Sequence, residues 1–156
     1  GTNYAGFQMN SAARTLQAEL ELALYKARLI STPNFGYPHK YSWSTSGRTD
    51  KGVHANAQVV SCKLEFSDDQ VQDVNKVRED INANLPKEIQ VLDVRRTTRN
   101  FCAKTSRNKV RYQYMIPSFL FHPDSANLFS KHGVQSKRSN QDRITAQELM
   151  AIRQEL

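Results

Sequence analysis

Apolar residues recur along this chain with two different periods, and segments of the two kinds alternate. A period near 3.6 residues predicts amphipathic helices over residues 11–29 and from Ser67 to an end near residues 82–86. A period of two predicts strands over 58–66 and 110–116, and a short run of β-prone residues predicts another over 89–94. Strands interleaved with one-faced helices predict an α+β fold, with a mixed or antiparallel sheet and the helices packed on one side of it.

The expected apolar faces can be assigned to individual residues. In the first helix the face is made by Leu16, Leu20, Ala23, Leu24 and Ala27, with Gln17 and Glu21 largely off it. In the second helix Ser67 is the expected N-cap, and the mostly apolar stripe runs through Val71, Val74, Arg78 and Ile81. The last strand places Val110, Tyr112, Tyr114 and Ile116 on one face, where the alternation favours core positions.

Length and composition favour one domain, because 156 residues that are 38% hydrophobic can bury a single core. The stretch of about 122–143 is polar, basic and rich in turn formers, and we expect a mobile insertion there. A capping box at Thr145 and Glu148 then predicts a helix that is still running at Leu156. A helix that stops without a cap is typical of a fragment boundary.

The net charge of +7 and the pI near 9.6 produce a field that attracts polyanions, such as nucleic acid or an anionic membrane. Charge alone does not choose between these partners. The longest apolar runs are only a few residues, which predicts a soluble protein without a membrane span. Two cysteines, Cys62 and Cys102, lack the spacing of a metal site, so we expect no metal and a reducing compartment.

One short segment, residues 47–54, concentrates groups that could carry chemistry. Asp50 stands between Arg48 and Lys51, with Gly47 and Gly52 on either side of the three. The cations favour an ionised carboxylate, as a nucleophile or general base requires, and the glycines allow tight turns. From the residues alone, the commoner alternative is a turn in which the aspartate binds backbone amides and the cations are solvated.

The same segment, extended to Ala55, closely resembles the active-site signature of the TruA-type tRNA pseudouridine synthases. Further stretches resemble landmarks of this family in the expected order, over roughly residues 1–121; they are 4–8, 15–17, 58–60, 81–86, 101–104 and 111–114. Lys51 and the run 114–121 resemble the eukaryotic branch. The resemblance implies the N-terminal half of a pseudouridine synthase catalytic domain, with the C-terminal half absent.

The family detaches uracil from ribose, rotates it and rejoins it through carbon 5 without a cofactor. The resemblance implies that Asp50 is the catalytic carboxylate, acting either as a nucleophile or as a base on a ribose proton. Arg48 would occupy the space left by the flipped uridine, and Tyr112 would stack on the base. The remaining expected RNA-binding residues are Thr49, Lys51, His54 and Lys104; for His54, positioning the loop is the favoured alternative.

The implied substrate is tRNA, in the region of the anticodon arm, with other structured RNAs as an alternative. A basic residue of the second half would pair with the aspartate, so we expect this fragment to be inactive by itself. A rival hypothesis is a non-catalytic tRNA-binding or RNA-chaperone module, which needs the basic surface but not Asp50. The expected state is a monomer or a homodimer, and the expected location is intracellular: the nucleus, with the cytoplasm and the mitochondrion as alternatives.

Overall fold

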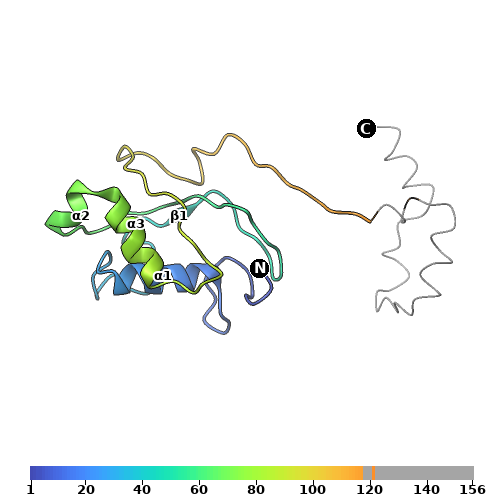
Figure 1. Ribbon diagram of the computed structural model, residues 1–156, viewed down its shortest axis with the longest axis horizontal. Helices are drawn as coiled ribbons and strands as arrows, with labels where there is room; N and C mark the ends of the chain where they lie inside the picture. Colours follow the sequence, from blue (N-terminus) through green and yellow to red (C-terminus); the bar gives the residue numbers. More distant parts are fainter. Residues whose placement is uncertain (118–120, 122–156) are drawn as a thin grey trace. The chain divides into compact units, whose positions relative to one another are not determined.

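The computed structural model describes residues 1–117 and 121. Its elements follow one another as α1 (Leu16–Lys26), β1 (Ser44–Thr45), β2 (Val60–Ser61), α2 (Asp68–Gln72) and α3 (Val74–Ala83), as Figure 1 shows. The chain divides into two compact units, Gly1–Val110 and Arg111–Leu156, and these five elements lie in the first. Helices combined with a two-stranded antiparallel sheet make the predicted α+β arrangement. The expected insertion and final helix fall outside the described residues.

Helix α1 starts where the sequence provides a cap, since the Thr15 side chain accepts a hydrogen bond from the Ala18 amide at 3.3 Å. The helix is shorter than predicted at both ends. Glu21, expected off the apolar face, is buried, because its Oε1 accepts hydrogen bonds from the Tyr41 hydroxyl at 2.6 Å and from the Gly36 amide at 3.1 Å. Two donors compensate for the loss of water around this carboxylate.

The helix predicted from Ser67 is divided in two at Asp73. Ser67 is the N-cap of α2 as expected, but the Asp73 side chain caps α3 by accepting a hydrogen bond from the amide two residues later at 2.8 Å. The break changes the phase of the apolar stripe. Val77 and Ile81 are therefore the buried residues of α3, whereas Val71 is exposed.

The antiparallel sheet is shorter than the sequence predicts. Ser44 pairs with Ser61 and Thr45 with Val60, so the strand expected over 58–66 contracts to two residues. No strand forms over 89–94 in the part of the chain that the structure describes. There the carboxamide of Asn82 donates to the Val91 carbonyl at 2.9 Å and accepts from the Val91 amide at 2.8 Å, which leaves neither group for a ladder.

The strand predicted over 110–116 is also absent from the described residues. This stretch has no regular hydrogen-bonded structure, and Tyr114, for which the alternation favours the core, is 82% exposed. Alternation of apolar side chains produces a strand only when another strand pairs with it. Within residues 111–117 and 121 of the second unit, no such partner is present.

The core of the first unit lies between α1, α3 and the chain that links α1 to β1. Its buried members are Ala23, Leu24, Leu29, Ile30, Tyr41, Val77 and Ile81. Trp43 and Cys62, which flank the sheet, pack against this cluster and are partly buried. Figure 1 shows α1 and α3 crossing below the segment that carries β1. The core therefore fixes the base of the hairpin that leads to the candidate site.

Candidate functional site

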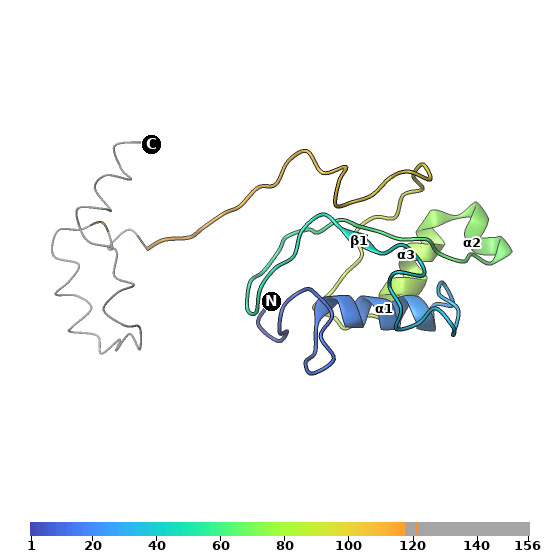
Figure 2. The ribbon, with the colours of Figure 1, turned by 180° about the vertical axis from the view of Figure 1, so that it is seen from behind.

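The segment between β1 and β2 is a long hairpin, and its tip carries Asp50. Pairing continues beyond the strands through the Ser46 amide, which donates to the Val59 carbonyl at 2.9 Å. At the tip the Val53 amide donates to the Asp50 carbonyl at 3.1 Å, and Gly52 takes φ +80°, which glycine adopts without strain. Figure 2 shows the tip beside the N-terminus of the chain. We call residues 47–54 the Asp50 loop.

The N-terminal segment, residues 1–8, binds the Asp50 loop through three hydrogen bonds. The Phe7 amide donates to the Thr49 carbonyl at 2.9 Å. The Arg48 guanidinium donates to Oε1 of Gln8, and Thr2 Oγ1 lies 3.1 Å from His54 Nε2. Residues 4–8 and 47–54, which are distant in the sequence, thus lie in contact with each other. The positioning role of His54 stays a prediction, and its observed contact is with the Thr2 side chain.

Gly6 allows the N-terminal segment to approach this closely. Its φ is +120°, in a region that L-residues rarely adopt, and a Cβ added there would lie 3.0 Å from the Thr49 carbonyl oxygen. That spacing is tight against a rigid backbone atom. Position 6 therefore requires glycine, because a larger residue would displace the backbone of the Asp50 loop at Thr49.

The start of α1 holds the N-terminal segment in turn. The Leu16 amide donates to the Gly6 carbonyl at 3.2 Å, and the Gln17 amide donates to the Phe7 carbonyl at 2.9 Å. The Gln17 side chain adds a third contact by accepting from the Met9 amide at 3.1 Å. The support of the Asp50 loop therefore extends from the loop to the first turn of α1, a helix with one buried face.

Asp50 itself is exposed to solvent. Among residues 1–117 and 121 its carboxylate has no hydrogen-bond or ion-pair partner, and the Arg48 guanidinium is directed to Gln8 instead. The alternative in which Asp50 caps backbone amides of its own turn is therefore not what the structure contains. Lys51 is also exposed. The loop presents a carboxylate that an incoming substrate can reach.

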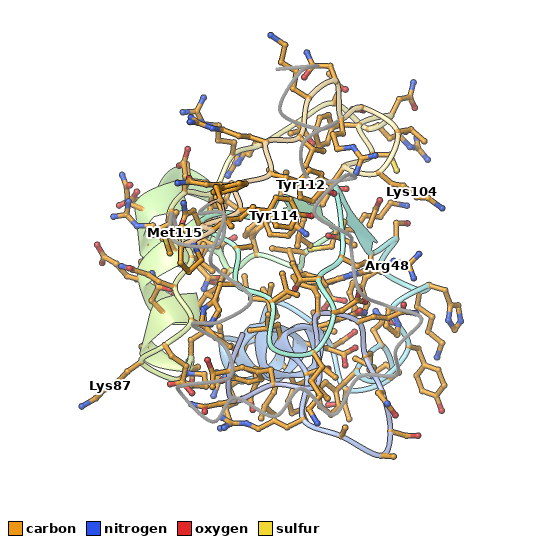
Figure 3. The ribbon with its side chains drawn as sticks, turned by 90° about the vertical axis from the view of Figure 1, so that its right-hand side faces the viewer. Arg48, Lys87, Lys104, Tyr112, Tyr114 and Met115 are labelled. Atoms are coloured by element: carbon orange, nitrogen blue, oxygen red, sulfur yellow. The ribbon has the colours of Figure 1, made fainter. Side chains whose placement is uncertain are left out.

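The other side of the hairpin is held by the segment after Phe101. The Lys104 amide donates to Ser44 Oγ at 3.1 Å, and the Arg107 guanidinium donates to the Ser46 carbonyl. The Lys104 side chain is exposed, and Figure 3 shows it projecting on the same side of the first unit as Arg48. Arg107 thus has a structural contact with the hairpin.

Tyr112 lies in the second unit, which is described by itself. Its side chain is 76% exposed. The alternation in the sequence favours a core position for Tyr112, and this side chain does not take one in the described part of the second unit.

The two cysteines have opposite environments. Burial raises the pKa of the Cys62 thiol to about 12. Hydrogen bonding, chiefly with the Ser44 hydroxyl at 3.1 Å and then with Thr105, lowers the pKa of the Cys102 thiol to about 6. Within residues 1–117 and 121 no three His, Cys, Asp or Glu side chains gather as a metal site requires, and no helix there is long and apolar enough to cross a membrane.

Comparison with known proteins gives a consistent set of relatives, although no protein-family model matches the chain. It is 37% identical over 123 residues to "tRNA pseudouridine synthase 1" of Schizosaccharomyces pombe, covering 79% of this chain and 22% of that protein. It is 33% identical over 133 residues to "tRNA pseudouridine(27/28) synthase" of Saccharomyces cerevisiae, covering 85% and 34%. The mouse "Pseudouridylate synthase 1 homolog" is 37% identical over 128 residues, covering 80% and 29%. The chain thus spans about a fifth to a third of the length of these curated relatives.

Proposed function

Because this chain is homologous to the eukaryotic tRNA pseudouridine synthases over most of its length, we propose that the whole protein isomerises uridine to pseudouridine in tRNA. The observation that best supports this is the Asp50 loop. Its carboxylate is exposed and has no partner among the described residues, while the backbone beside it is held by the N-terminal segment. A fixed backbone that presents a reachable carboxylate is what a reaction at a ribose carbon requires.

In the proposed reaction the bond between the ribose carbon and the base nitrogen breaks, the base rotates, and a bond to base carbon 5 forms. The proton on carbon 5 then leaves and the freed base nitrogen takes up a proton, so reactant and product are isomers and no external cofactor is consumed. Asp50 has two chemically available roles: nucleophilic attack, or removal of a ribose proton to give a glycal-like intermediate. Both need the ionised form of the carboxylate.

A uridine in folded tRNA must leave its stack before it reaches Asp50, at a cost of about a few kcal/mol. We assign Arg48 to the space that the uridine vacates, since a planar guanidinium can stack on neighbouring bases and bind phosphate together. Gln8 occupies one of its N–H groups and leaves the others for RNA. Tyr112, exposed in the second unit, is assigned to stack on the flipped base.

Binding of the rest of the tRNA is assigned to the basic surface. The net charge of +7 attracts phosphates, and Lys51 and Lys104 present exposed ammonium groups. Thr49 and His54 lie in the same loop and are assigned secondary contacts with the RNA. We propose the anticodon arm as the target region; the S. cerevisiae relative is named for positions 27/28 of tRNA.

The decisive experiment is tritium release from tRNA labelled at uridine carbon 5, using the whole protein and its Asp50→Ala variant. We expect release that is lost in the variant by at least about 10⁴-fold, while tRNA affinity stays within about threefold. Asp93→Ala, which removes an exposed carboxylate paired with the nearby Arg95, is the matched control and should keep full release.

The outcome also tests the rival hypothesis. Binding of tRNA without release by the unmodified protein, over a panel of tRNAs, would favour a non-catalytic RNA-binding module. We further propose that residues 1–156 alone bind tRNA weakly and show no turnover, and measurable turnover by this chain would contradict that. A nuclear location and a monomeric or homodimeric state complete the proposal; imaging of the tagged whole protein and its sedimentation would test them.

A further inference from the structure

The Arg48 side chain is held at its tip by Gln8, which lies in the family landmark 4–8 and outside the active-site segment 47–55. Gln8 Oε1 accepts a hydrogen bond from Arg48 Nη1, although the two residues are 40 positions apart. Both side chains are exposed, so core packing does not impose this contact. A hydrogen bond between a guanidinium and an amide oxygen is charge-assisted and stronger than one between neutral groups.

The Gln8 backbone is itself well placed to provide a fixed acceptor. Its neighbour Phe7 donates to the Thr49 carbonyl at 2.9 Å and accepts from the Gln17 amide at 2.9 Å. These two hydrogen bonds fix the backbone next to Gln8 relative to Thr49, the residue directly after Arg48, and relative to the first turn of α1. Movement of the Asp50 loop would carry Gln8 and Arg48 together.

An arginine side chain has several rotatable bonds, and an unrestrained guanidinium must lose that freedom when it enters an RNA stack. A single hydrogen bond to Nη1 fixes one end of the planar group and leaves its other N–H groups free to bind. The restraint reduces the entropy lost at the moment of base flipping.

We propose that Gln8 is a positioning residue that holds the Arg48 guanidinium ready to replace the flipped uridine. This inference rests on the proposed function, and it assigns Gln8 a part in the flipping step rather than in tRNA affinity or in the bond changes at Asp50. A side chain whose effect passes through orientation alone should affect kcat more than KM.

The test compares Gln8→Met with Gln8→Glu in the whole protein. Methionine keeps the length of the side chain but removes the acceptor, whereas glutamate keeps an acceptor oxygen at the same reach. Base flipping is followed by the fluorescence of 2-aminopurine placed next to the target uridine, and turnover by tritium release. We expect Gln8→Met to slow flipping and kcat by about fivefold to tenfold with tRNA Kd within about twofold, and Gln8→Glu to restore the rate to within about twofold.

Three results would overturn the proposal: no loss in Gln8→Met, an equal loss in both variants, or a loss confined to tRNA affinity. An equal loss accompanied by a lower melting temperature would assign Gln8 a role in folding alone. Gln90→Met makes the same substitution at an exposed glutamine outside the Asp50 loop contacts, and it should change neither readout. Absence of release by the unmodified protein would instead overturn the proposed function, which separates the two failures.

Discussion

Replacement of Gly6 by alanine tests whether the close approach of the N-terminal segment fixes the Asp50 loop. The new methyl group would meet two obstacles. The φ of +120° is unfavourable for an L-residue, and the added Cβ would lie 3.0 Å from the Thr49 carbonyl oxygen, a backbone atom that cannot rotate away. Gly36 provides a matched control, because its φ is +83° but nothing lies within 4 Å of an added Cβ.

Gly6→Ala should therefore lower the free energy of unfolding more than Gly36→Ala does, because only the Cβ at position 6 is crowded by the Thr49 carbonyl oxygen. Backbone strain at a positive φ costs about 1 kcal/mol, which sets the expected loss of unfolding free energy for Gly36→Ala. Displacement of the Thr49 carbonyl, with weakening of the Phe7 hydrogen bond, adds about 1 to 2 kcal/mol in Gly6→Ala. At a denaturant slope of about 1.5 kcal/mol per molar urea, the midpoint of Gly6→Ala should fall by about 1 to 2 M.

Urea unfolding of the chain can be followed by the fluorescence of Trp43, the single tryptophan, which packs against the core. In the whole protein, Gly6→Ala should also lower tritium release from tRNA more than Gly36→Ala does. Equal midpoints for the two variants would refute the reasoning, since the Thr49 contact would then contribute nothing. Equal activities would show that the loop keeps its position without the close approach.

Two further predictions concern groups away from the Asp50 loop. Asn82→Ala removes both hydrogen bonds to Val91 and should lower the free energy of unfolding by about 2 kcal/mol in urea titrations; a loss below about 0.5 kcal/mol would show that water replaces the carboxamide. Cys102, whose pKa is lowered to about 6, is a thiolate above that pH, so alkylation by iodoacetamide should rise to half its maximum near pH 6, as mass spectrometry can measure. Ser44→Ala should move that midpoint upward, while partly buried Cys62, whose pKa is raised to about 12, stays unmodified in the folded protein; an unchanged midpoint would exclude the Ser44 hydrogen bond as the main cause.

The sequence predicted the parts of the site but not their assembly. Glycines around Asp50 indicate a constrained loop, and the structure places a turn there with Gly52 at positive φ. No local pattern indicates that Gln8 reaches Arg48, or that Phe7 binds Thr49, because these contacts join distant positions through one acceptor atom each. The ordered family landmarks identified both stretches, and only the three-dimensional structure shows them in contact.

The fold was predicted where local signals agree with packing. The N-cap predicted at Ser67 marks a real helix start, and the α+β class follows from the alternating periods. The predicted helix from Ser67 and the predicted strand over 89–94 differ from the structure because polar side chains form hydrogen bonds with backbone groups there. Asp73 caps α3 and divides the predicted helix, and Asn82 takes the hydrogen bonds of Val91 that a strand would need.

The hydrogen bonds between the N-terminal segment and the Asp50 loop join residues 40 to 52 positions apart, and they close the intervening chain into a ring. The entropy of closing such a ring depends only weakly on its length, at about 0.6 kcal/mol for each doubling. The exposed turn at Gly36 lies within this ring and makes no contact with the Asp50 loop in the described structure. Residues inserted at that turn should therefore leave the Asp50 loop in place, which makes the turn a suitable position for a reporter peptide or a second RNA-binding module.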